Sequence, residues 1–138
     1  MEADLRAAPQ VTGRVLFDAP PVLLVDDDSA AREAAAGLLT HWGCRVATAG
    51  SGAEAHALLD GSAPPPALIV CDYRLGDHER GTEVARSLSE RLGAAIPTLI
   101  VSADVTPALR EEAAAAGYHL LQKPLKAAKL RALLQHVL

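Results

Sequence analysis

Short apolar runs alternate along this chain with longer stretches in which apolar residues recur every three or four positions. Runs of this kind are typical of strands that are buried on both faces, as in a parallel sheet covered by helices. Five of them predict strands, at Val22 to Asp26, Arg45 to Ala49, Ala67 to Cys71, Ile96 to Ser102 and His119 to Gln122. Four of the five runs, all but Arg45 to Ala49, end at or just before a polar residue, so the pattern also marks where these strands stop.

The stretches between these runs have the spacing of amphipathic helices; Val84, Leu88 and Leu92, for example, lie four residues apart. Ser29 is a suitable cap for the first helix, and Gly43 is a fitting stop. The predicted helices are Ser29 to about Trp42, Ser51 or Gly52 to about Leu59, Thr82 to Leu92, Pro107 to Ala116, and the segment after Pro124. Strands joined by such helices form a parallel sheet through right-handed crossovers.

The pattern predicts an α/β fold with five strand-helix units and a flavodoxin-like strand order of 2-1-3-4-5. Residues 22–138 form this single domain in the prediction. Residues 1–21 mix Ala, Pro, Gly and charge without sustained periodicity, which favours a linker or a loosely held arm. Val15 to Phe17 is a weak candidate for a short edge strand, and Tyr73 to Arg80 is predicted to be a loop.

Composition excludes several classes of function. At 138 residues the chain has room for one domain. Its formal charge of -4 and its lack of a basic run argue against nucleic-acid binding. It has no apolar run of about 18 residues and no basic leader before an apolar segment, so neither a membrane span nor a secretory signal is visible. Cys44 and Cys71 lack metal-type spacing and predict buried, reduced thiols in a cytoplasmic protein.

The polar residues at the strand ends carry the candidate chemistry, because the carboxyl ends of parallel strands share one edge of the sheet. Asp26, Asp27 and Asp72 would meet there, and three neighbouring carboxylates are best relieved by a hard divalent cation such as Mg²⁺. A carboxylate can also act as a nucleophile toward phosphorus. Ser102, which ends the fourth strand, and Lys123, which follows the fifth, would hold phosphoryl oxygens. Together they predict phosphoryl transfer onto Asp72.

These residues occur in an order that resembles a known family. Val25, Asp26 and Asp27, then Asp72, then Ser102 with Ala103, then Lys123 with Pro124, are similar to the receiver domain of two-component response regulators. The resemblance covers about Val22 to Leu138. It implies that Asp72 accepts a phosphoryl group from a phosphohistidine.

The resemblance also implies a role for each matching position. Asp27 would bind Mg²⁺ directly and Asp26 directly or through water, with Asp72 and the backbone carbonyl of Arg74 as further ligands. Ser102 and Lys123 would hold the phosphoryl oxygens, and Ala103 is small enough to leave them accessible. The Lys123–Pro124 bond would be cis, which costs little before proline.

The chain departs from the family pattern at two places. Leu120 stands where the family often has a Tyr or Phe three residues before the lysine, a ring that takes part in switching. The loop Gly76 to Gly81 lacks the common Pro-Asp-Gly turn. Arg74 and Asp104 occupy the two positions that tune the loss of the phosphoryl group in the family, so we expect both to matter here.

The resemblance implies a signalling module and not an enzyme in its own right. Phosphorylation would alter the surface of the fourth helix, fifth strand and fifth helix, and the donor would be a histidine kinase or a histidine phosphotransfer protein. The Asp-Tyr-Arg-Leu, Leu-Leu-Gln-Lys-Pro-Leu and Leu-Arg-Ala-Leu-Leu runs are similar to receivers at the carboxyl end of hybrid sensor histidine kinases. A stand-alone regulator remains an alternative, and the sequence leaves open whether the chain forms a homodimer.

Two rival functions use the same fold. A doubly wound enzyme that binds a nucleotide or flavin needs a glycine-rich phosphate cradle after the first strand, where this chain has Asp27, Asp28 and Ser29. A degenerate receiver that only binds partners would lack an acid or the lysine, and this chain has all of them.

Overall fold

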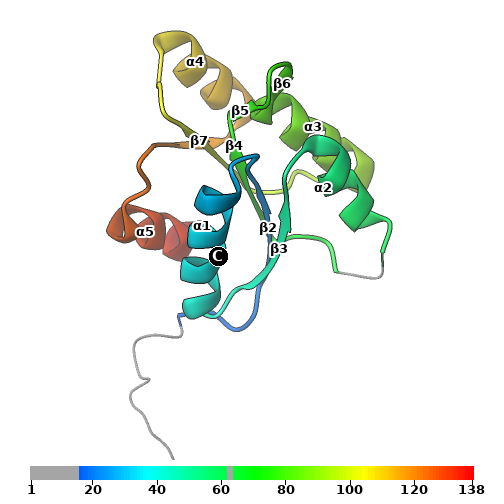
Figure 1. Ribbon diagram of the computed structural model, residues 1–138, viewed down its shortest axis with the longest axis vertical. Helices are drawn as coiled ribbons and strands as arrows, with labels where there is room; N and C mark the ends of the chain where they lie inside the picture. The colour runs from blue at the N-terminus through cyan, green and yellow to red at the C-terminus, as the bar shows by residue number, and fades with distance from the viewer. Residues whose placement is uncertain (1–15, 62–63) are drawn as a thin grey trace, which may run out of the picture.

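The computed structural model describes residues 16–61 and 64–138, which form a parallel sheet between two layers of helices (Figure 1). The strands of the sheet are β2 (Pro21–Val25), β3 (Arg45–Ala49), β4 (Leu68–Asp72), β7 (Thr98–Ser102) and β8 (His119–Gln122). All neighbouring pairs are parallel, in the order β3-β2-β4-β7-β8. Counted along the chain this order is 2-1-3-4-5, so the predicted flavodoxin-like topology is confirmed.

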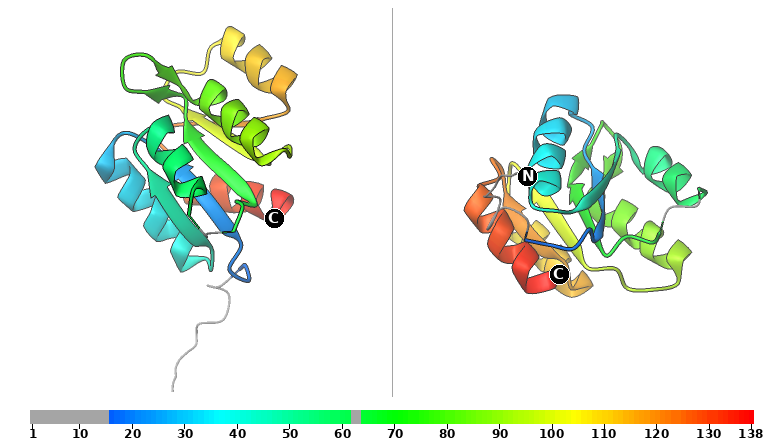
Figure 2. Two further views of the ribbon diagram at one scale, coloured as in Figure 1. Left: turned by 90° about the vertical axis from the view of Figure 1, so that its right-hand side faces the viewer. Right: turned by 90° about the horizontal axis from the view of Figure 1, so that it is seen from below.

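Helices cover both faces of the sheet (Figure 2). They are α1 (Ser29–His41), α2 (Gly52–Leu59), α3 (Gly81–Leu92), α4 (Pro107–Ala116) and α5 (Ala127–Val137). Alternate strand residues point to opposite faces, so Val22 and Leu24 join one core cluster with residues of α1 and α5, while Leu23 and Val25 join a second with residues of α2 and α3. Each central strand is therefore buried on both sides, which explains its unbroken apolar run.

Helix α1 begins with a cap that differs from the predicted one. The side chain of Asp28 accepts hydrogen bonds from the N–H groups of Ala30 and Ala31, at 3.0 and 3.3 Å, so Asp28 is the N-cap and Ser29 is the first helical residue. A carboxylate at this position satisfies free N–H groups and interacts favourably with the positive end of the helix dipole. The exposed third acid of the run thus has a structural use that differs from metal binding.

The segment Tyr73 to Arg80 was predicted as a loop, and this prediction is wrong in part. Strands β5 (Arg74–Leu75) and β6 (Glu79–Arg80) pair antiparallel in a small hairpin beside the carboxyl edge of the sheet. Gly76 follows β5 with a φ of 70°, a left-handed conformation that favours glycine. Two-residue strands are too short to show the alternation that reveals a strand in a sequence.

Most of the predicted arm, residues 1–21, lies outside the described residues. Val15, the first residue of the candidate edge strand, lies outside them as well. Leu16 and Phe17 are not in a strand; both N–H groups donate to the Trp42 carbonyl, at 2.8 and 3.1 Å, and both side chains pack against the first cluster. Cys44 and Cys71 are buried free thiols, as predicted. In the described ranges, none of the helices has the length and apolar character needed to cross a membrane.

Candidate functional site

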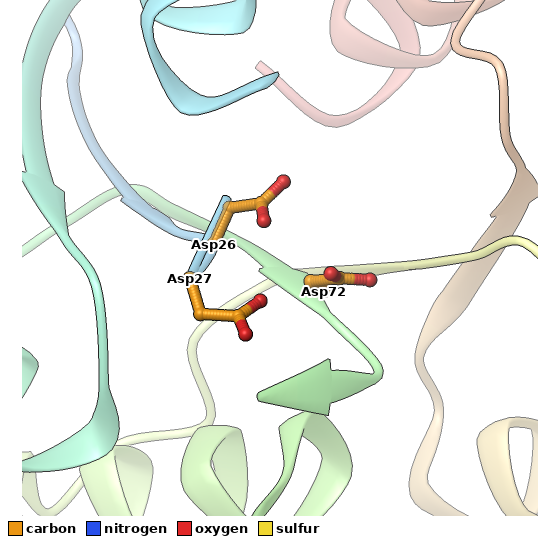
Figure 3. A group of neighbouring side chains, drawn as sticks. All are labelled: Asp26, Asp27 and Asp72. Atoms are coloured by element: carbon orange, nitrogen blue, oxygen red, sulfur yellow. The ribbon is translucent and has the colours of Figure 1, made fainter. Parts of the chain in front are cut away.

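Three carboxylates meet at the carboxyl edge of neighbouring strands β2 and β4. Asp26 and Asp27 follow β2, and Asp72 is the last residue of β4, which pairs with β2 in register Val25 to Cys71. One oxygen from each of the three acids lies within 4.8 Å of the other two (Figure 3). The parallel sheet thus brings together acids that are far apart in the sequence.

The main chain of Asp26 is held on both sides. Its N–H donates to the Ala49 carbonyl at 3.0 Å, and its carbonyl accepts from the Arg32 guanidinium at 2.7 Å. The residue is 7% exposed, and its Oδ1 accepts from the N–H of Asp28 at 3.0 Å. Asp27 is more exposed, and its Oδ2 accepts from the N–H of Gly76 at 3.0 Å. The two adjacent acids are therefore oriented by different parts of the chain.

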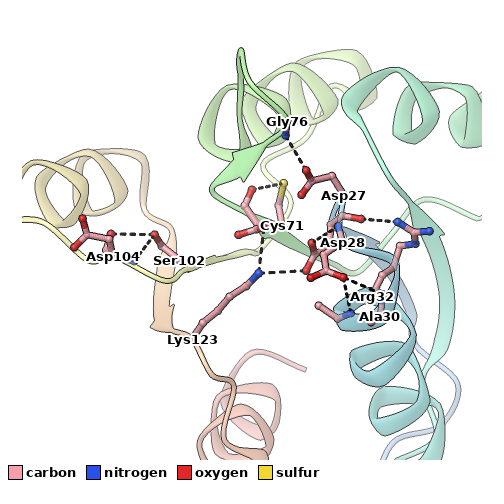
Figure 4. A network of polar contacts seen from close by, with 12 residues as sticks. Asp27, Asp28, Ala30, Arg32, Cys71, Gly76, Ser102, Asp104 and Lys123 are labelled. Carbon is pink, nitrogen blue, oxygen red and sulfur yellow. Dashed lines mark hydrogen bonds and ion pairs between the residues drawn. The ribbon is translucent and has the colours of Figure 1, made fainter.

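Lys123 supplies the positive charge of the site. It follows β8 and reaches past β7, so that its Nζ lies 3.1 Å from Asp72 Oδ2 and 3.5 Å from Asp26 Oδ2 (Figure 4). Its N–H donates to the Ser102 carbonyl at 2.8 Å, which joins it to the end of β7. The Lys123–Pro124 peptide bond is cis, as the resemblance implies. Four predicted residues, three acids and one lysine, thus share one site.

Burial and opposite charge shift the pKa values of Asp72 and Lys123 in opposite directions. Burial raises the pKa of Asp72. The hydrogen bond and the charge of Lys123 lower it, but only in part, and the negative charges of Asp26 and Asp27 raise it further. Burial lowers the pKa of Lys123, but its hydrogen bond with Asp72 and the charges of Asp72 and Asp26 outweigh burial and leave the pKa raised. Three carboxylates face one ammonium, and all three offer oxygen donors. This donor set fits a hard divalent cation such as Mg²⁺.

The raised pKa of Asp72 predicts how stability depends on pH in the absence of metal. A carboxyl whose pKa is higher in the folded chain favours folding below its unfolded pKa and loses that contribution as the pH rises through the folded value. Asp72→Asn, which cannot ionise, is therefore expected to raise the free energy of unfolding at neutral pH. Urea unfolding in chelator at neutral and acidic pH measures this; a gain that fails to shrink toward acidic pH would contradict the charge explanation.

Ser102 lies at the end of β7 but its hydroxyl is not directed at the acids. It donates to the Asp104 carbonyl at 2.9 Å and accepts from the Asp104 N–H at 3.2 Å, and the residue is 3% exposed. The hydroxyl therefore closes a turn after β7. Its predicted contact with a phosphoryl oxygen stays a prediction.

The remaining predicted positions surround the site. Ala103 lines a cavity of about 560 Å³ together with Asp72 and Lys123. Its small side chain leaves the space beside the acids open. Arg74 lies exposed in β5, and Asp104 is exposed after β7. Leu120, in place of the family's aromatic residue, is partly buried against the second core cluster. These placements leave their predicted roles open to experiment.

Sequence reasoning missed two residues that shape the site. Gly81 begins α3 directly against the carbonyl of Asp72: a Cβ there would overlap that oxygen and lie 3.0 Å from Cys71 Sγ. A glycine at the start of a predicted helix was the available signal, since glycine is a poor helix former. Arg32 looks like any exposed helix residue in the sequence, and nothing in the sequence pattern connects it with the Asp26 carbonyl.

Comparison with known proteins supports the family that the site residues resemble. The family model for the response regulator receiver domain matches residues 22–135. The chemotaxis protein CheY4 of Vibrio cholerae is 27% identical, with a TM-score of 0.76 over 87% of this chain and 99% of that chain. A response regulator receiver protein from Burkholderia phymatum is 27% identical, with a TM-score of 0.71 over 86% and 94%.

A third solved structure, the N-terminal domain of an uncharacterized protein from Wolinella succinogenes, is 29% identical, with a TM-score of 0.72 over 86% of this chain and 94% of that chain. A sequence search against curated proteins gives no significant match. Because the family model covers most of the chain and the fold agrees, the chain belongs to the response regulator receiver domain family.

Proposed function

We propose that this chain is the phosphoacceptor of a two-component signalling pathway and that Asp72 receives the phosphoryl group in a Mg²⁺-dependent reaction. The observation that carries the proposal is the cluster of Asp26, Asp27 and Asp72 with Lys123 3.1 Å from Asp72. A nucleotide-binding enzyme would need N–H groups that bind phosphate at the end of β2, and this chain has carboxylates there. A phosphoryl acceptor, in contrast, needs a carboxylate nucleophile and carboxylates that bind a metal ion, and both are present here.

In this reaction a carboxylate oxygen of Asp72 attacks the phosphorus atom of a phosphohistidine. A new P–O bond forms, the P–N bond breaks, and its electron pair leaves with the imidazole of the donor. Bound Mg²⁺ would supply positive charge for the phosphoryl oxygens and relieve repulsion among the acids. Asp26, Asp27, Asp72 and the carbonyl of Arg74 are the proposed metal ligands.

The ammonium of Lys123 already contacts one oxygen of Asp72, so it is well placed to pair with a phosphoryl oxygen once that group is attached. Ser102 would have to exchange its bonds to the Asp104 main chain for one to the phosphoryl group. That exchange would shift the turn after β7, which leads into α4. We propose that this shift carries the signal to the surface of α4, β8 and α5.

The proposed donor is a histidine kinase or a histidine phosphotransfer protein in the cytoplasm. The three runs that resemble hybrid receivers support a parent chain in which a kinase core supplies the phosphoryl group. Arg74 and Asp104, both exposed near the site, would set how fast water removes it.

The direct test is incubation of the chain with Mg²⁺ and a small acyl phosphate, followed by intact mass spectrometry. We expect a gain of one phosphoryl mass per chain, because Asp72 attacks the acyl phosphate as it would a phosphohistidine, with a carboxylate as the leaving group. The matched control contains a chelator and should show no gain. A chain that stays unmodified in Mg²⁺, or gains the same mass in chelator, would refute the proposal.

A further inference from the structure

A hydrogen bond joins the β5–β6 hairpin to the acidic cluster. The N–H of Gly76, the first residue of the turn, donates to Asp27 Oδ2 at 3.0 Å (Figure 4). Asp27 is the exposed member of the cluster, and an exposed carboxylate rotates freely unless a partner fixes it. The direction of this carboxylate therefore depends on where the hairpin holds the Gly76 amide.

The other strand of the hairpin is tied to helix α2. Glu79, partly buried in β6, accepts a hydrogen bond through Oε1 from the N–H of Gly52 at 2.9 Å. Gly52 is the first residue of α2, where free N–H groups and the helix dipole favour a carboxylate. A Cβ on Gly52 would overlap the Glu79 carboxylate and lie 3.1 Å from Val84 Cγ2. Glycine at this position thus makes the space that Glu79 occupies.

Strand pairing connects the anchored Glu79 with the position of Gly76. Glu79 pairs with Leu75, the residue immediately before Gly76, and Leu75 is 3% exposed in the second core cluster. The position of Gly76 is therefore fixed by a buried side chain on its own strand and by the anchored glutamate on the facing strand. The hairpin is a short connection between α2 and Asp27.

We propose that Glu79 is a positioning residue: by anchoring the hairpin on α2 it holds the Gly76 amide that presets Asp27 to bind a divalent cation. The inference rests on the proposed function, because it concerns the same metal site. A carboxylate held in place before binding loses less rotational freedom when the cation arrives, which increases affinity.

The test is calorimetric titration of Mg²⁺ into the full chain and its variants. Glu79→Ala removes the anchor and is expected to weaken Mg²⁺ binding about threefold to tenfold. Glu79→Gln removes the charge but keeps an oxygen that can accept from Gly52, so its affinity should stay near that of the unaltered chain. Glu83→Ala is the matched control, because Glu83 is an exposed acid close by that pairs with Arg80, and it should leave affinity unchanged.

A second measurement tests the premise in the unaltered chain as well as in the variant. In amide hydrogen exchange followed by NMR, the Gly76 N–H of the metal-free chain should exchange more slowly than that of exposed Asp77, because it is bonded to Asp27. In Glu79→Ala this protection should fall. Equal exchange at Gly76 and Asp77 in the unaltered chain would overturn the proposal, even if the alanine variant failed to fold.

The titration separates this inference from the proposed function. If the unaltered chain binds Mg²⁺ and Glu79→Ala binds it equally well, the positioning role is overturned and the proposed function stands. If Glu79→Gln loses as much affinity as Glu79→Ala, a simple charge effect accounts for the result and the positioning role is again overturned. An unaltered chain that binds no Mg²⁺ overturns both.

Discussion

Asp72→Asn is expected to abolish the gain of phosphoryl mass from an acyl phosphate. The amide has nearly the shape of the carboxylate but lacks the negative oxygen that attacks phosphorus. The raised pKa of Asp72 in the folded chain indicates that neutralising it costs no stability. Intact mass spectrometry with Mg²⁺ gives the modification, and circular dichroism verifies that the variant is folded.

The control for this prediction is Asp18→Asn. Asp18 is exposed and precedes Ala19, whose N–H donates to the Gly43 carbonyl just before β3 begins, so it lies near the amino ends of the strands and away from the acidic cluster. The control should gain one phosphoryl mass like the unaltered chain. Modification that persists in folded Asp72→Asn would place the acceptor elsewhere and remove the basis of the proposed function.

Gly81→Ala is expected to lower the free energy of unfolding by about 3 kcal/mol, an overpacking effect at the upper end of the usual range. The added Cβ would overlap the carbonyl of Asp72 and crowd Cys71 Sγ, both on a central strand that cannot move without disturbing two cores. The Gly81 N–H also donates to the Tyr73 carbonyl at 2.7 Å. Urea unfolding at equilibrium measures the loss.

Gly37→Ala is the matched control because it makes the same substitution in a helix without a steric conflict. Gly37 lies within α1, and a Cβ there meets no atom within 4 Å. The variant should be more stable than the unaltered chain by up to about 1 kcal/mol, since alanine is the better helix former. Equal stability of Gly81→Ala and the unaltered chain would show that the start of α3 can shift away from β4 at no cost.

The fold could be predicted from the sequence because its signals are local. The range predicted for β3, Arg45–Ala49, and that for α4, Pro107–Ala116, agree with the structure. The central strand was recognisable because its apolar run stops at Asp72, and the same logic placed Asp26 and Asp27 beside it. Topology then brought Lys123 into the site without any further information.

What the sequence did not indicate depends on contacts made only in three dimensions. The Ser102 hydroxyl bonds to the main chain of Asp104 in the turn after β7, a local geometry that no pattern in the sequence indicates. Glu79 of the β5–β6 hairpin bonds to Gly52 of α2, 27 positions earlier in the chain, and no periodicity in the sequence indicates such a pairing. Asp28 and Ser29 are both good caps by composition, and backbone geometry selects Asp28.

The path of Lys123 across β7 has a consequence for the order in which the site is completed. Asp26, Asp27 and Asp72 leave the ribosome long before Lys123, which follows the last strand of the sheet. Until β8 docks, the nascent acids repel one another with no ammonium between them. The final strand therefore closes the sheet and brings the ammonium to the three acids in the same step, so that the partial relief of their repulsion depends on complete synthesis of the domain.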